Sequence, residues 1–205
     1  MKIGSGSPFW YRPRMQVAAI DHPGSRQEER FLTATPVANF MASMPPPGMA
    51  PGTRRWELLV KAIIEVFCPR WYPGAAVLCI CDTEGNRVHL DSNALASLGV
   101  SIRSAAKIPS LIVHDTKRNW LLLIEAVTSA GPVDGKRRKE LKDLFAGCKA
   151  GLVFVTAFEN RKTMLSFGSD IAWESEVWIA EDPDHMIHFN GERFLGPYPD
   201  VMPTK

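Results

Sequence analysis

The sequence lacks the features of a membrane protein or a secreted protein. Its longest uninterrupted apolar run, Ala75 to Cys81, is far short of the roughly 20 residues that a membrane-spanning helix needs. The first residues contain no apolar segment that would make a signal peptide. The 4 cysteines include no Cys-x-x-Cys pair, which argues against a zinc site and against a disulfide framework. We therefore expect a cytoplasmic protein without membrane contact.

What the chain does have is the composition of a folded protein. Its 205 residues, 45% hydrophobic and 22% charged, indicate a globular chain of one domain, or of one domain with an appendage. Residues 1–54 contain the segment MPPPGMAPG and many small residues, and they show no sustained period. We expect residues 1–54 to be a proline-rich N-terminal extension and residues 55–205 to be the functional domain.

Charge is distributed unevenly along the chain, although the formal net charge is only +2. Between Arg103 and Lys142 there are nine lysines and arginines against four acidic residues, whereas between Asp170 and Asp200 there is one against eight. A basic segment of this kind can bind a polyanion such as nucleic acid. Alternatively, the basic and acidic segments pair with each other within the fold.

The hydrophobic pattern alternates between helix and strand periods, and several short apolar runs are typical of strands buried on both faces. Helices are predicted over Trp56–Phe67, ended by Pro69 and Pro73, after Asp91 or Ser92 as far as Gly99, over Lys136–Cys148 with Asp134 as N-cap, and over Arg161–Phe167. Strands are predicted over Ala75–Cys81, Arg87–Leu90, Ser110–Asp115, Trp120–Ser129, Gly151–Ala157, Glu176–Ala180 and Met186–Phe189. This order predicts an α/β core with a mixed sheet.

The two central strands are expected to form a hairpin across the polar turn of residues 116–119. If Asp115 faces Trp120, then Ser110 lies opposite Glu125, whereas Asp115 has the other parity and faces away from them. Glu125 lies in an otherwise apolar strand, where a lone carboxylate is costly to bury unless it is used. Oxygen ligands on adjacent strands can hold Mg²⁺ against a phosphodiester. The alternative is that Glu125 simply reaches solvent near the strand end.

From about Arg55 to Tyr198 the sequence resembles the C-terminal domain of the BsuBI/PstI type II restriction endonucleases, within the PD-(D/E)XK nuclease superfamily. The resemblance rests on RNWLLLIEAVTS (Arg118–Ser129), GPV with the Lys136-Arg137 pair that follows it, GLVFVTAF (Gly151–Phe158) and DIAWESEVWIAEDPDHMIHFNGERFLGPY (Asp170–Tyr198). It implies a restriction-endonuclease-like mixed β-sheet flanked by helices, with residues 55–205 as the catalytic domain. It also implies a Mg²⁺-dependent endodeoxyribonuclease that cuts double-stranded DNA as a homodimer. Members of the family carry a separate N-terminal domain, for which residues 1–54 look too short.

The site residues that the resemblance implies are partly altered here. Glu125 matches the acidic residue of the second half of the motif, but Ser110 stands where the family pattern has aspartate. Asp82, at the end of its buried strand, is the best substitute ligand, and Val127 stands at the usual lysine position. Lys136 is then the best candidate for a relocated lysine. Because a hydroxyl adds no charge, we expect weakened metal affinity and activity that is reduced or absent.

The basic helix carries the residues expected to contact DNA phosphates, which are Lys136, Arg137, Arg138 and Lys139. Two other functions remain open. One is a catalytically silent DNA-binding module that keeps the nuclease fold, favoured by the serine at position 110 and by the expectation that residues 1–54 are too short to form the N-terminal domain of the family. The other is an interaction protein without DNA affinity, in which the basic helix docks on the acidic C-terminal segment.

Overall fold

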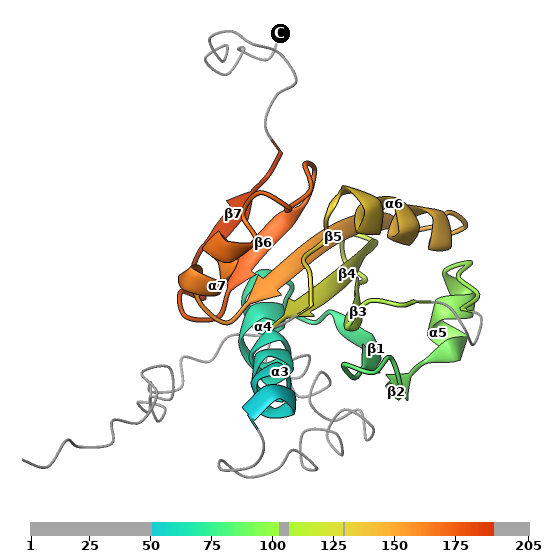
Figure 1. Cartoon of the computed structure of the whole chain (residues 1–205). Helices are drawn as coiled ribbons and strands as arrows, with labels where there is room; N and C mark the ends of the chain where they lie inside the picture. The colour runs from blue at the N-terminus through green and yellow to red at the C-terminus, as the bar shows by residue number, and fades with distance from the viewer. Residues whose placement is uncertain (1–50, 103–106, 129, 191–205) are drawn as a thin grey trace, which may run out of the picture.

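The computed structural model describes residues 51–102, 107–128 and 130–190, so that all but the last four residues of the expected N-terminal extension lie outside it. The described residues form a seven-stranded mixed sheet with helices on both faces (Figure 1). The predicted α/β class and the predicted order of helices and strands are therefore confirmed. Within the part of the chain that is described, no helix is both long enough and apolar enough to span a bilayer.

The strands are β1 (Ala76–Cys81), β2 (Arg87–Leu90), β3 (Leu111–Asp115), β4 (Trp120–Val127), β5 (Gly151–Phe158), β6 (Glu176–Ile179) and β7 (Met186–His188), in the spatial order β2-β1-β3-β4-β5-β6-β7. The helices are α3 (Pro51–Ala62), α4 (Cys68–Trp71), α5 (Ser92–Ser97), α6 (Gly135–Leu144) and α7 (Arg161–Ser166). The pairings β4–β5 and β5–β6 are parallel, and the others are antiparallel. Each parallel pair needs a crossover, which α6 and α7 supply.

The first helix is longer than the sequence pattern indicates. It begins at Pro51 and continues beyond Phe67, through a π-helical turn (Ile63–Phe67) and then α4, so the prediction that Pro69 ends it was wrong. In the widened turn the Cys68 N–H bonds to the carbonyl of Ile63, five residues earlier. A helical segment then restarts with Pro69 among its first positions, where a proline without an N–H is tolerated.

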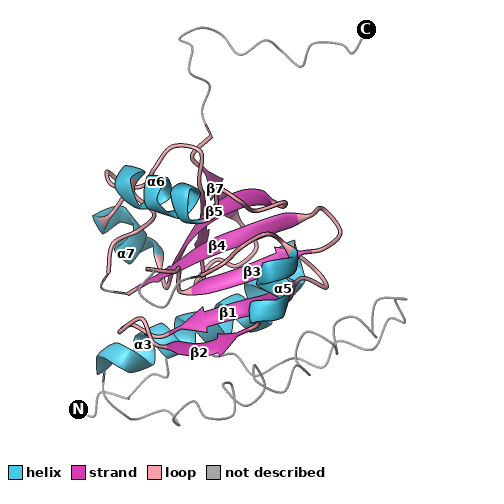
Figure 2. Cartoon of the chain, turned by 90° about the vertical axis from the view of Figure 1, so that its right-hand side faces the viewer, coloured by secondary structure: helices cyan, strands magenta, loops and turns pink. Residues whose placement is uncertain are grey.

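Two apolar clusters hold α3, α4, α5 and α6 against the two faces of the sheet. On one face, α3 and the π-helical turn bring Val60, Ile63 and Phe67 against even-numbered residues of β4 such as Leu122. On the other face, α5 and α6 cover odd-numbered residues of β4. Leu141 is one of the residues through which α6 makes this contact. Figure 2 shows α3 behind β1 and β2 and α5 in front of them. Because side chains alternate along a strand, Glu125 projects on the face that α6 covers.

The hairpin between β3 and β4 has the predicted register, from Asp115 opposite Trp120 to Leu111 opposite Ile124. Asp115 points away from Glu125, as its parity predicts, and only 1% of it is exposed. Its carboxylate accepts the Lys117 N–H at 3.0 Å and forms an ion pair with Arg118 at 2.8 Å. The buried carboxylate therefore fixes the turn that sets the register of the hairpin.

We expect Asp115→Ala to lower the free energy of unfolding by about 1–3 kcal/mol, because it leaves turn amides and a guanidinium without their acceptor. Asp115→Asn should cost less, since its amide oxygen can still accept the Lys117 N–H. Urea unfolding monitored by circular dichroism measures both, with exposed Thr116→Ala as the control in the same turn. Equal stability of Asp115→Ala and Thr116→Ala would contradict this role.

Candidate active site

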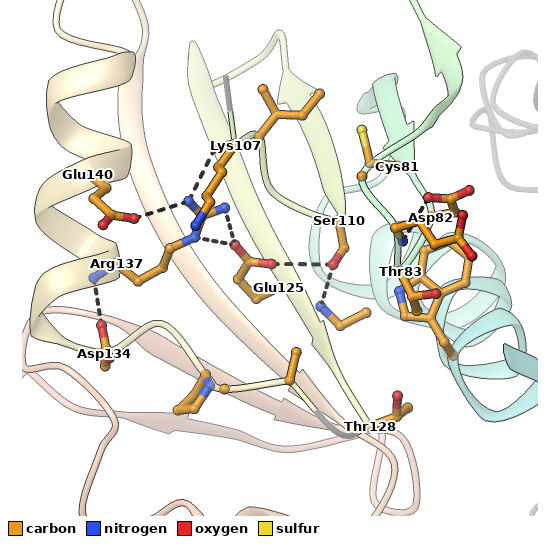
Figure 3. A pocket seen from close by; sticks show the side chains of 18 of the residues that line it. Cys81, Asp82, Thr83, Lys107, Ser110, Glu125, Thr128, Asp134, Arg137 and Glu140 are labelled. Carbon is orange, nitrogen blue, oxygen red and sulfur yellow. Dashed lines mark hydrogen bonds and ion pairs between the residues drawn. The ribbon is translucent and has the colours of Figure 1, made fainter. Parts of the chain in front are cut away.

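A cleft of about 760 Å³ opens beside the start of β3 and the end of β4. The turn after β1 forms one side of it and the first turn of α6 forms the other (Figure 3). Its polar lining includes Asp82, Lys107, Ser110, Glu125, Arg137 and Glu140. The three residues that the sequence predicts as metal ligands, Ser110, Glu125 and Asp82, all line this cleft, but only Ser110 and Glu125 are in contact.

Ser110 and Glu125 are in contact, as the predicted hairpin register requires. The Ser110 hydroxyl donates to Glu125 Oε2 at 3.3 Å and accepts the backbone N–H of Ala126 at 3.1 Å. Ser110 lies one residue before β3, and its carbonyl still accepts the Cys81 N–H at 2.9 Å. The serine is therefore held by the sheet on both sides, and its hydroxyl orients the carboxylate.

Glu125 is a largely buried carboxylate whose compensating charge is Arg137. The side chain of Glu125 is only 15% exposed. Arg137 donates to Glu125 Oε1 through Nε at 2.8 Å, and its Nη2 lies 2.7 Å from the same oxygen. Burial raises the pKa of the Glu125 carboxyl, and the Arg137 charge and the hydrogen bond from Ser110 oppose that rise. The two nitrogens of Arg137 thus favour the ionised form of this carboxylate.

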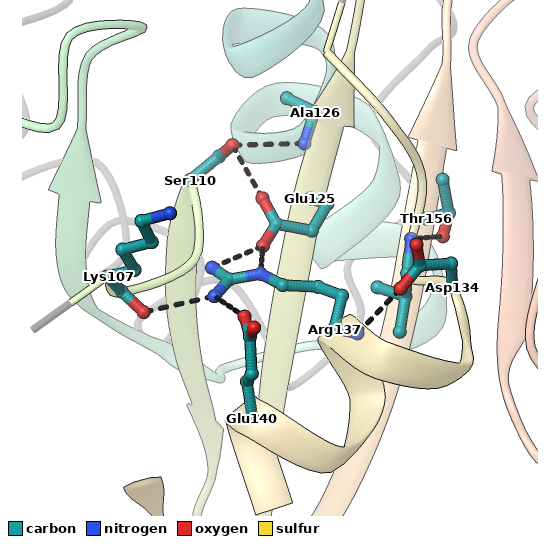
Figure 4. Close-up of polar contacts among 9 residues, drawn as sticks. Lys107, Ser110, Glu125, Ala126, Asp134, Arg137, Glu140 and Thr156 are labelled. Carbon is teal, nitrogen blue, oxygen red and sulfur yellow. Dashed lines mark hydrogen bonds and ion pairs between the residues drawn. The ribbon is translucent and has the colours of Figure 1, made fainter.

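The path of the chain before α6 explains why Arg137 reaches Glu125. Thr156 of β5 lies beside Glu125 in the parallel register, and its hydroxyl accepts the Val133 N–H at 3.1 Å. The next residue, Asp134, caps α6 by accepting the Arg137 N–H, as predicted for the N-cap (Figure 4). The sheet therefore fixes the start of α6 directly above Glu125.

Arg137 makes two further contacts at the wall of the cleft. Its Nη1 donates to the carbonyl of Lys107 at 3.2 Å and lies 3.6 Å from Glu140 Oε2 (Figure 4). With its side chain only 18% exposed, the guanidinium lies between one buried carboxylate and one half-exposed carboxylate. The sequence prediction placed Arg137 only among DNA-binding residues and missed its contact with Glu125. The available signal was its spacing, because Arg137 precedes the buried Leu141 by four residues and so shares its face.

Lys136, the predicted substitute for the motif lysine, also lines the cleft but lies in a different environment. Its side chain is 85% exposed, and Nζ lies 3.9 Å from Glu140 Oε1. The other two basic residues predicted to contact DNA have their own acidic partners. Arg138 pairs with Glu174, and Lys139 lies 2.7 Å from Asp143.

Asp82 lies on the opposite side of the cleft, where its carboxylate organises the turn after β1. It accepts the backbone N–H groups of Glu84 at 2.9 Å and Asn86 at 2.7 Å, and the Asn86 side-chain amide at 2.9 Å. Slight burial acts to raise the pKa of Asp82, but these hydrogen bonds outweigh it and the pKa is lowered. Asp82 is thus an ionised carboxylate at the edge of the cleft.

Glu125, Ser110 and Asp82 each bring oxygen atoms to the cleft, a donor set that suits a hard cation such as Mg²⁺. Mg²⁺ characteristically keeps several waters and uses one or two carboxylates together with substrate phosphate. A preformed cluster of three histidine, cysteine, aspartate or glutamate residues is absent from the residues that the structure describes. The types of donor atom present in the cleft therefore fit a hard divalent cation.

Comparison with known proteins gives the same family from sequence and from structure. The family model of the BsuBI/PstI restriction endonuclease domain matches residues 47–192. The type II restriction enzyme BsuBI of Bacillus subtilis is 51% identical over 140 residues, which are 68% of this chain and 44% of the relative. The type II restriction enzyme AplI of Arthrospira platensis is 32% identical over 181 residues, 85% of this chain and 53% of the relative.

Among solved structures, the SdaI restriction endonuclease is similar with a TM-score of 0.64 and 47% identity, covering 70% of this chain and 46% of that one. The predicted restriction-endonuclease-like fold is thereby confirmed. This chain spans about half the length of the relatives that it matches. The match of residues 47–192 to the family model shows that the chain belongs to the BsuBI/PstI restriction endonuclease domain family.

Proposed function

We propose that this chain carries the catalytic domain, over residues 55–205, of a Mg²⁺-dependent, site-specific endodeoxyribonuclease of the type II restriction class. The observation that carries the proposal is the contact between Glu125 and Ser110 at the cleft, where the sheet presents oxygen ligands on neighbouring strands. Relatives that share the sequence around these residues are named type II restriction enzymes. A cytoplasmic location fits an enzyme that meets DNA inside a cell.

In this function Glu125, Ser110 and Asp82 hold the metal ion from the two sides of the cleft. When bound, the ion neutralises charge on the scissile phosphate and makes water a better nucleophile. Glu125 contributes a charge fixed in orientation by Arg137 and Ser110. Ser110 contributes a neutral oxygen, and for that reason we expect weaker metal affinity than with two carboxylates on the strands.

The basic residues of the cleft supply the contacts to DNA. Lys107 and Lys136 line the cleft with exposed side chains, so both can reach phosphates of a bound duplex. Arg138 and Lys139 can join them by exchanging Glu174 and Asp143 for phosphate oxygens. A duplex has two antiparallel strands to cut, so we propose a homodimer that places one site on each.

The assignment of metal ligands is tested by cleavage of a mixed-sequence supercoiled plasmid with Mg²⁺ or Mn²⁺. We expect Glu125→Ala to lower the rate by on the order of 100-fold, because the buried ligand charge is lost. Ser110→Asp should raise the rate, because it adds a second negative charge to the metal site. Thr128→Ala, which alters another residue of the cleft, serves as the control.

Either of two outcomes would overturn the proposed ligands. One is cleavage by Glu125→Ala at the rate of the parent chain. The other is cleavage by the parent that Ser110→Asp abolishes. Absence of cleavage by all variants, together with retained DNA binding, would favour the second function described next.

The second candidate function is a catalytically silent DNA-binding module. The observation that favours it is that both oxygens of Glu125 are already engaged, Oε1 by Arg137 and Oε2 by Ser110. With serine at the first ligand position, the net charge available to a divalent cation is small. The same cleft then binds DNA through its lysines, without hydrolysis.

Both functions predict salt-dependent DNA binding that requires the cleft lysines. In fluorescence anisotropy with a duplex oligonucleotide, Lys107→Ala and Lys136→Ala should each reduce the slope of log affinity against log salt by about 0.9. Lys162→Ala on α7, which removes an exposed lysine outside the cleft lining, should leave the slope unchanged. No DNA affinity at low salt would contradict both functions and point to a protein interaction module.

A further inference from the structure

The contact between Arg137 and Glu125 has a consequence for the metal site. The carboxylate carries one negative charge, and two nitrogens of Arg137 lie within 2.8 Å of its Oε1. A divalent cation bound at the other oxygen, beside Ser110, would share that charge with the guanidinium. Because the site is largely buried, repulsion between the two cations is weakly screened by water.

We propose that Arg137 is an internal counter-cation that lowers the affinity of the cleft for its divalent metal ion. This inference rests on the proposed function, in which Glu125 is a metal ligand. Without Arg137, ionised Glu125 would be a largely buried, uncompensated charge. Arg137 therefore keeps the Glu125 carboxylate charged and oriented, but it also competes with the metal ion for that carboxylate.

The other contacts of Arg137 allow it to yield the carboxylate. Nη1 already touches the Lys107 carbonyl at 3.2 Å, and Glu140 Oε2 lies 3.6 Å away. A small rotation of the guanidinium toward Glu140 would release Oε1 without leaving the arginine unpaired. DNA phosphates add negative charge to the cleft, and the forked guanidinium matches their geometry. Metal uptake is therefore favoured once DNA is bound.

Lys136 provides a matched control for this proposal. It is the neighbouring residue in the first turn of α6, and its replacement removes the same formal charge from the same cleft. Its ammonium lies 3.9 Å from Glu140, and its side chain is 85% exposed, whereas Arg137 contacts Glu125 and is 18% exposed. Comparing the two variants separates the local contact from the general change in net charge.

The test is the Mn²⁺ affinity of the full chain without DNA, measured by electron paramagnetic resonance titration at about pH 8.5. We expect Arg137→Met to bind Mn²⁺ on the order of tenfold more tightly than the parent, because the competing charge is gone. Lys136→Met should match the parent within about twofold, since exposed charges are strongly screened. Circular dichroism verifies that each variant is folded.

Three results are informative beyond the expected one. Equal or weaker Mn²⁺ binding by Arg137→Met, with binding lost in Glu125→Gln, would overturn this proposal and leave the proposed metal site intact. If Glu125→Gln binds Mn²⁺ as tightly as the parent does, the proposed ligand set is overturned, and this proposal with it. If Arg137→Met does not fold, Arg137→Gln replaces it. Glutamine also removes the charge but keeps a polar side chain that can donate to Glu125, and unchanged or weaker Mn²⁺ binding by it would overturn the proposal.

Discussion

A largely buried carboxylate on a central strand is the constraint on which the arrangement of this domain depends. Glu125 lies near the end of the central strand β4, between apolar Ile124 and Ala126 in the sequence, and its charge is compensated by Arg137 and its orientation fixed by Ser110. Burying such a charge without a partner costs several kcal/mol. The helix that brings the partner must therefore be placed accurately over the sheet.

A continuous series of contacts, which starts and ends at Glu125, places α6 over the sheet. Glu125 and Thr156 are neighbours across β4 and β5, and Thr156 holds the Val133 N–H through its hydroxyl. Asp134 then caps α6, and α6 returns Arg137 to Glu125. The site is thus built on rigid elements and a short anchored connection, which is the arrangement that keeps ligand geometry constant. Asp82 completes the cleft from the turn after β1.

The sequence was sufficient to predict the hairpin register, the Ser110–Glu125 contact and the Asp134 cap, because period two and capping are local rules. It did not identify which basic residue of α6 meets Glu125. Adjacent helical residues point about 100° apart, so that choice depends on how the helix is rotated over the sheet, for which the spacing of Arg137 from apolar Leu141 was the available signal. The extent of the first helix was also mispredicted, since a π-helical turn lets the chain pass Pro69.

The central claim, that Arg137 sustains the charge of Glu125, is tested most directly by a double-mutant cycle of Glu125→Gln and Arg137→Met. The free energy of unfolding of the parent, both single variants and the double variant is measured in urea with a metal chelator. The account predicts a favourable coupling of at least about 1 kcal/mol between the two residues, with the double variant more stable than the two separate losses imply. A coupling near zero would contradict it.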